Sequence, residues 1–227
     1  SESRLVYGGS IENAKRDGHS AVVWNGSMFV WGGMGQIGQN RIYRNTMDIM
    51  DLDQWKELKS GGTPRYSHAG VAFEDKLYFW GGTDGGDEFR TMEVYDTQSD
   101  EWSSGVEGGQ ARKGHSAVLD QSKIFFWGGQ KSSELLNTLD VYDLISSTWI
   151  TGFFGGRERS EHTANFVGGK IYHWGGENDS SVIDTIDIYS ITSFEKPWEA
   201  KPGPTTETGR SGHTATLVDN EIFFFKI

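Results

Sequence analysis

Cysteine is absent from all 227 residues of the chain, and proline occurs only four times. Without cysteine there can be no disulfide framework, no thiolate zinc site and no cysteine nucleophile. Long apolar runs are missing as well, since no stretch approaches the about twenty residues that a membrane-spanning helix requires. The first residues carry no signal-peptide pattern. We therefore expect no membrane insertion, and the compartment stays open, with the cytoplasm slightly favoured.

Positive charge is scarce. The chain has 21 lysines and arginines against 32 aspartates and glutamates, which gives a formal net charge of −11. Binding to a phosphate backbone needs a basic surface, so we expect no nucleic-acid partner. A negative net charge favours neutral or basic partners, although it also simply keeps a protein in solution. The sequence is rich instead in glycine (31 residues) and tryptophan (nine), which suits short strands, tight turns and packed sheet faces.

One signature, an arginine followed three residues later by a histidine, recurs five times. The five histidines are 49, 47, 47 and 51 residues apart. A fixed period near fifty predicts a stacked or circular repeat in which each unit buries one face against the next. The pairs are Arg16 with His19, Arg65 with His68, Arg112 with His115, Arg159 with His162, and Arg210 with His213.

Each repeat predicts four short antiparallel strands. In the third copy, residues 115–119 are small and apolar after the histidine, residues 123–127 are strongly apolar after a lysine, residues 137–143 alternate with period two, and a fourth strand begins at Trp149. The differences in length between copies fall in the turns. The other copies repeat a tryptophan and a glycine pair twelve residues after the histidine (Trp31, Trp80, Trp127, Trp174), an acid in the third strand (Asp48, Glu93, Asp140, Asp187) and a tryptophan in the fourth (Trp55, Trp102, Trp149, Trp198).

This pattern resembles the kelch repeat over nearly the whole chain. The resemblance implies an all-β protein, a β-propeller of four-stranded antiparallel blades around a central channel, with binding surfaces on the loops at one end of the channel. We expect a single domain over residues 1–227. Its blades are predicted over residues 16–58, 65–105, 112–153 and 159–201, with a last blade made of residues 210–227 plus 1–9.

The number of blades depends on the two ends of the chain. Val6 stands thirteen residues before His19, and Trp55, Trp102 and Trp149 stand thirteen residues before their own histidines. On that spacing residues 4–7 form a fourth strand, which completes the blade that residues 213–225 begin. Five blades are therefore favoured. A fragment of a six- or seven-bladed propeller is the alternative, because the composite blade lacks a third strand.

The recurring histidines and arginines are interpreted as structural, because a residue that recurs in every blade serves a packing need that recurs in every blade. We expect each imidazole to hydrogen-bond loop backbone between blades and not to bind a metal. We expect each guanidinium to hold carbonyl groups or an acid such as Asp51, Asp96 or Asp143. The alternative places the arginines around the channel, where they hold an anionic ligand.

Candidate binding residues are sought where the copies differ. The position before the histidine is glycine in three copies but Ser67 and Glu161 in two, and the loops after the glycine pairs differ most. Aromatic and arginine side chains together with carboxylates suit the binding of a peptide or loop of a partner protein. The predicted partner-binding residues are Arg41, Tyr43, Arg44, Tyr66, Ser67, Asp84, Glu88, Phe89, Arg90, Lys113, Gln130, Lys131, Glu161, Glu177 and Asn178.

Enzymatic alternatives find less support. Some proteins that resemble kelch repeats are galactose oxidases, whose cofactor needs a cysteine that this chain lacks. The iron site of kelch-type specifier proteins fails because Ser181 stands where an aspartate is required. Epimerase-like sugar chemistry, with Glu161 or Glu177 as the base, stays open, since the fold alone does not decide function. An engineered or truncated repeat array without a natural ligand is the third alternative. We predict a non-enzymatic protein-interaction module without cofactor or metal.

Overall fold

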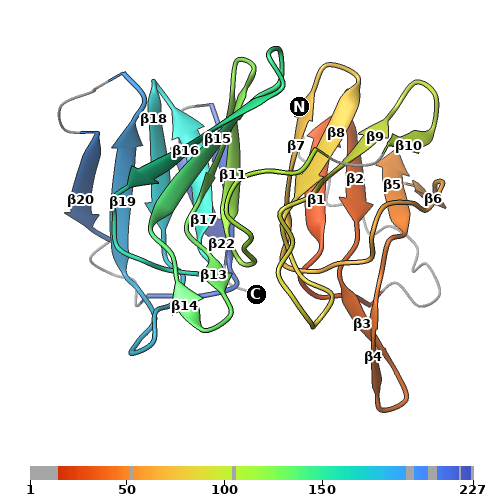
Figure 1. The fold of residues 1–227 in the computed structure, drawn as a ribbon, viewed down its shortest axis with the longest axis horizontal. Coiled ribbons are helices and arrows are strands. Elements are labelled where there is room, and N and C mark those ends of the chain that lie inside the picture. Colours follow the sequence, from red (N-terminus) through yellow and green to blue (C-terminus); the bar gives the residue numbers. More distant parts are fainter. Residues whose placement is uncertain are drawn as a thin grey trace. The chain divides into compact units, whose positions relative to one another are not determined.

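The computed structural model describes residues 15–51, 54–103, 106–192, 197–203, 209–219 and 221–225. Over these residues every regular element is a β-strand, and no helix long and apolar enough to cross a membrane is found. The chain divides into two compact units, which are described separately (Figure 1). The first unit comprises Ser1–Asp87 with Thr91–Glu107, and the second comprises Glu88–Arg90 with Gly108–Ile227.

The first unit contains two four-stranded antiparallel sheets whose strands follow one another in a meander. Between β2 and β5 the chain forms an additional hairpin of β3 (Met34–Ile37) and β4 (Asn40–Tyr43), which extends from its blade in Figure 1. The sheets consist of β1 (Ser20–Trp24), β2 (Ser27–Trp31), β5 (Met47–Asp51) and β6 (Gln54–Glu57), and of β7 (Ala69–Phe73), β8 (Lys76–Trp80), β9 (Met92–Asp96) and β10 (Glu101–Ser103).

The second unit also contains two four-stranded antiparallel sheets, and it has two short sheets of two strands each. The four-stranded sheets consist of β11 (Ser116–Asp120), β12 (Lys123–Trp127), β15 (Thr138–Asp143) and β16 (Thr148–Phe154), and of β17 (Thr163–Val167), β18 (Lys170–Trp174), β19 (Thr185–Ser190) and β20 (Trp198–Pro202). The pairs are β13 (Gln130–Lys131) with β14 (Glu134–Leu135), and β21 (Thr214–Val218) with β22 (Glu221–Phe225).

The predicted all-β fold is confirmed: the sheets are four-stranded antiparallel blades of the β-propeller type, and each begins just after its histidine. The expected pairing of the two chain ends in a last blade depends on residues 1–9, which lie outside the described residues.

Aromatic and aliphatic side chains fill the space between neighbouring blades of each unit. Trp31 and Phe29 of β2 pack with Leu77 and Phe79 of β8 in the first unit. In the second, Trp127 packs with Val118, Leu139 and Ile171 in the same way. Burial of such large apolar surfaces is the main driving force for folding, and it explains why a blade that is apolar on both faces needs a neighbour.

A buried arginine–acid pair joins the strands of each four-stranded blade. Arg112 Nη2 donates to Asp140 Oδ2 at 2.5 Å, while its Nη1 donates to the carbonyl oxygens of Gly128 and Thr138, both at 2.9 Å. The planar guanidinium thereby holds the second strand, the third strand and its own loop together. We call this arrangement the arginine–acid latch, and it recurs as Arg16 with Asp48, Arg65 with Glu93, and Arg159 with Asp187.

The prediction that Asp51, Asp96 or Asp143 pairs with these arginines is wrong. Asp143 lies three residues beyond the latch residue Asp140, and side chains that far apart on a strand point to opposite faces. Its carboxylate accepts hydrogen bonds from the N–H groups of Ile145 and Ser146 and lies 3.2 Å from Lys123 Nζ. Asp96 has the same role in its blade, and Asp51 accepts a hydrogen bond from Ser27.

Two of the signature histidines, His68 and His162, connect neighbouring blades within a unit. His68 Nε2 shares a hydrogen bond of 2.8 Å with Ser20 Oγ of the preceding blade, and the imidazole packs edge-on against Trp31. His162 makes the equivalent contacts with Ser116 and Trp127. The partner in both cases is a hydroxyl group of a first strand and not the loop backbone that we expected.

The glycine pairs allow this close approach. Gly32 has a φ of +71°, and a Cβ on it would lie only 2.6 Å from His68 Cε1, so no other residue fits without displacement of the histidine.

Candidate functional site

The loop before the first strand and the loop after the second strand meet at the same end of each four-stranded blade. Single antiparallel bridges join them, and we call this end of a blade its loop end. The bridges pair Asp17 with Met34, Tyr66 with Thr83, Lys113 with Gln130, and Ser160 with Glu177. The two sets of loops that the sequence singled out are therefore brought together within each of these blades.

The position just before each signature histidine adopts the left-handed conformation. Glycine fills it in three copies, but Ser67 has a φ of +52° and Glu161 a φ of +53°. A residue with a Cβ in this region is strained by about 1–3 kcal/mol, a conformation that turn residues such as Glu74 and Gln121 also adopt. The backbone N–H of Ser67 donates to the Gly18 carbonyl at 2.7 Å, and that of Glu161 donates to the Gly114 carbonyl at 2.8 Å. These bonds hold the strained residues in place.

In the first unit the candidates form an aromatic cluster. Tyr43 of β4 stacks on Tyr66 of the neighbouring blade, with ring centroids 5.6 Å apart and ring planes 15° apart. The Tyr43 hydroxyl lies close against Gly85, where an added Cβ would be only 2.0 Å away. Arg41 is exposed on the hairpin that carries Tyr43, and Asp84 is exposed next to Gly85 on the loop after β8. Arg44 turns away and lies over Gly35 of its own hairpin.

In the second unit several candidates are occupied by contacts with one another. Glu88 lies 3.0 Å from Lys113 Nζ and accepts a hydrogen bond from the Ser132 N–H at 3.1 Å. Burial by itself would raise the pKa of Glu88, but these hydrogen bonds outweigh it, so the pKa of Glu88 is lowered. Gln130 donates to the Ser132 carbonyl, and Asn178 accepts from the N–H groups two and three residues ahead. These four side chains shape the loops that present the exposed Lys131 and Glu177.

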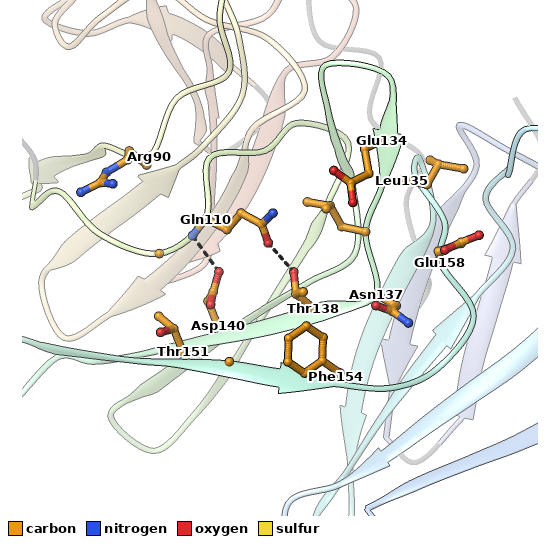
Figure 2. Close-up of a pocket in the computed structure, with 13 residues that line it drawn as sticks. Arg90, Gln110, Glu134, Leu135, Asn137, Thr138, Asp140, Thr151, Phe154 and Glu158 are labelled. Atoms are coloured by element: carbon orange, nitrogen blue, oxygen red, sulfur yellow. Dashed lines mark hydrogen bonds between the residues drawn. The ribbon is translucent and has the colours of Figure 1, made fainter.

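A pocket of about 640 Å³ in the second unit was not predicted from the sequence (Figure 2). Figure 2 shows Arg90 at one side of it, with Glu134 and Glu158 at the other. Its floor is held by two hydrogen bonds, from the Gln110 N–H to Asp140 and from the Thr138 hydroxyl to the Gln110 side chain, both 2.9 Å long.

Of the residues that line this pocket, only Arg90 was among the predicted site residues, whereas Phe89 is half-buried next to it in the sequence. The pocket combines the segment between two blades, the β13–β14 hairpin and the end of β16. The signal that could have revealed it is the fourth strand of this blade, which differs in composition from its counterparts.

The sixth histidine, His173, lies in the interior. It occupies the position before Trp174. The equivalent residue is Phe79 in one other blade and Phe126 in another. Its Nδ1 lies 3.5 Å from the Ser116 hydroxyl, which His162 also contacts at 2.9 Å. Burial lowers the pKa of both histidines well below the usual value, so both are neutral. Because His173 is only 1% exposed, we assign it to packing and not to chemistry on a substrate.

The acidic groups of the interior are engaged as well. Each latch carboxylate is paired with its arginine, and no cluster of three or more histidine, aspartate or glutamate side chains suited to a metal ion occurs in the part of the chain that the structure describes. The two carboxylates considered as bases for sugar chemistry lie at the loop end: Glu177 is exposed, and Glu161 lies over Gly114.

Two comparisons with known proteins agree with this architecture. The KLHDC2/KLHL20/DRC7 Kelch-repeats domain matches residues 4–149 and 106–225. A protein of Drosophila melanogaster, the leucine-zipper-like transcriptional regulator 1 homolog, is 33% identical over 87 residues, which cover 35% of this chain and only 9% of that protein. With a domain match over most of its length and repeated four-stranded blades, the chain belongs to the kelch-repeat family.

Proposed function

We propose that this kelch-repeat chain is a protein-interaction module that binds a peptide or loop of a partner protein at its loop ends. The observation that carries the proposal is the left-handed conformation of Ser67 and Glu161, at a position where other blades have glycine. Glycine would adopt this backbone without strain, so the serine and glutamate side chains are retained at a cost in stability. A role in recognition accounts for that cost.

The surroundings of Ser67 suit recognition of a protein. The stacked Tyr43 and Tyr66 form a rigid aromatic surface beside it, and exposed Arg41 and Asp84 add one charge of each sign. Tyrosine and arginine dominate the binding energy of many protein interfaces because they combine large apolar area with a polar group. Loops held on packed strands present such groups with little loss of conformational entropy on binding.

In the second unit, Glu161 has a comparable setting. Lys131 and Glu177 are exposed on neighbouring loops, and the Glu88–Lys113 ion pair fixes the shape of the loop that carries Lys131. Charges of both signs at the loop ends favour a partner segment with charges of both signs. No residue here is assigned a catalytic role, and the proposal requires no cofactor.

The test is affinity capture from extracts with the wild-type chain and with the variant Arg41→Ala/Asp84→Ala/Glu177→Ala. A matched control changes the same number of charges at the opposite end of a blade, Glu74→Gln/Asp75→Asn/Lys76→Gln, in the β7–β8 turn. We expect the loop-end variant to lose specific partners that the control retains, with the same melting temperature for both. Identical partner sets for the wild type and the loop-end variant would overturn the proposal.

A further inference from the structure

The fourth strand of each blade is an edge strand, and edge strands are usually protected against pairing with other chains. Short length, charged side chains and proline are the common protective devices. β6 has four residues including Lys56 and Glu57, and β10 has only three. β20 has five residues with two charges and ends at Pro202. Each of these edges is therefore protected.

The edge strand β16 is neither short nor charged and contains no proline, and its only irregularity is a β-bulge at Gly152. It runs for seven residues, Thr-Trp-Ile-Thr-Gly-Phe-Phe, without a charge or a proline, and no other described strand pairs with its outer edge. Ile150, Phe153 and Phe154 are 44%, 42% and 69% exposed. A long apolar edge of this kind is a template to which an extended segment of another chain can add a strand.

The end of β16 forms one wall of the pocket of about 640 Å³ described above. The β15–β16 pairing is irregular between Leu139 and Val141, and Gly152 opposite has a φ of +91°, which is the geometry of a β-bulge. Bulges re-aim side chains and are frequent beside functional sites. Thr151, Gly152 and Phe154 all line the pocket, so the edge strand and the pocket form one continuous surface (Figure 2).

The charges around this pocket indicate what it would bind. Glu134 and Glu158 lie at the side opposite Arg90, both are exposed, and neither forms an ion pair with any described residue. A basic side chain in this pocket would gain a charge-assisted hydrogen bond with a carboxylate.

We propose that β16 and this pocket bind an extended apolar segment of a partner protein, which adds a strand to β16 and places a lysine or arginine between Glu134 and Glu158. Neither Ser67 nor Glu161 lines this pocket. A second copy of the chain fits less well, because its own β16 carries no cation for these carboxylates and because two chains of net charge −11 repel one another.

The experiment is selection of a displayed library of random nonapeptides on the purified chain, followed by fluorescence polarisation with the synthetic peptides that are enriched. We expect the enriched peptides to alternate apolar residues and to share a lysine or arginine near one end. We expect their affinity to fall at least tenfold for Glu134→Gln/Glu158→Gln and to be lost for Ile150→Lys.

The matched control is Glu199→Gln. Trp149 and Trp198 occupy equivalent positions of β16 and β20, so Glu199 is the counterpart of Ile150, and its substitution should leave the affinity unchanged. Hydrogen exchange with the peptide bound should show new protection at Ile150–Phe154. Circular dichroism verifies that each variant is folded.

Three results would overturn the proposal. The first is enrichment of no peptide, or of peptides that bind the double glutamate variant equally well. The second is protection at the loop-end residues Ser67 and Glu161 and not at β16, a result that leaves the proposed function intact. The third is a dimer in light scattering that Ile150→Lys dissociates, which would show that the edge pairs with a second copy.

Discussion

The residues of the sequence repeat recur in the interior of the blades but differ at their loop ends. In the interior the same contacts return in each four-stranded blade, with Arg65 on Glu93 and Arg159 on Asp187 in equivalent geometry. At the loop ends the same position of the repeat is Gly18 in one blade and Ser67 or Glu161 in others. Buried groups therefore keep the blades alike, whereas the surface that they support is free to differ.

The difference has a physical cause. A buried guanidinium without a counter-charge is costly, so each four-stranded blade has both an arginine and an acid, whether aspartate or glutamate. A loop-end residue must only tolerate the left-handed backbone, which serine and glutamate do at moderate cost. The amino-acid sequence can therefore vary at the loop ends, which a partner protein can reach.

The largest effect is expected when one partner of an arginine–acid latch is removed. Asp140→Ala leaves the fully buried Arg112 without its carboxylate. We expect the free energy of unfolding to fall by about 3–5 kcal/mol, which is the usual cost of an unpaired buried charge. Urea denaturation followed by tryptophan fluorescence measures it. Asp143→Ala, at the half-buried end of the same strand, should cost far less, and equal losses would show that the latch partner is misassigned.

A second test uses the neutral histidines of the interior. Burial lowers the pKa of His68, His162 and His173 well below the usual histidine value of 6.5, so the unfolded chain binds more protons than the folded chain below that pH. Stability should therefore fall as the pH drops below about 6.5, by about 1.4 kcal/mol per pH unit for each such histidine at most.

His173→Phe, which restores the residue found in the neighbouring copy, should make this fall shallower between pH 6.5 and 5. Denaturation curves at three pH values measure the slope. Superimposable slopes for the wild type and the variant would contradict a neutral buried His173.

A third test removes the strain at the loop ends. Ser67→Gly and Glu161→Gly should each stabilise the fold by about 1 kcal/mol, because glycine adopts positive φ without a steric penalty. The reverse change, Gly212→Ser, should destabilise by a similar amount, since its φ is +62° and an added Cβ would contact no atom within 4 Å. Thermal unfolding measures the three changes. Ser67→Gly should also weaken partner binding, and unchanged binding would remove the reason to retain a strained serine.

The smallest effect on stability is expected at the β16 edge. Ile150 is 44% exposed, so Ile150→Lys should change the free energy of unfolding by no more than about 0.5 kcal/mol. Chemical denaturation measures it. A larger loss would show that β16 is part of the packed interior and not a free edge.

The sequence allowed the strands, the glycine turns and the buried tryptophans to be predicted, because four copies at a fixed spacing constrain one another. The partner of Arg112 was not predicted correctly, since acids recur at the positions of both Asp140 and Asp143, and the face of the strand decides which one meets the arginine. The Tyr43–Tyr66 stack and the pocket around Glu134 and Glu158 join segments of different blades. Such contacts depend on how blades pack and not on any local pattern.

The most direct test of the central claim, that partners bind where the blades differ, is site-specific photo-crosslinking. A benzoylphenylalanine at Asp84 samples the loop end of its blade. One at Val23, which is 70% exposed next to the β1–β2 turn, samples the opposite end of its own blade. With a partner identified by affinity capture, the account predicts a crosslinked product from position 84, weakened by Ser67→Gly, and none from position 23. Equal yields from the two positions, or a product from position 23 only, would contradict it.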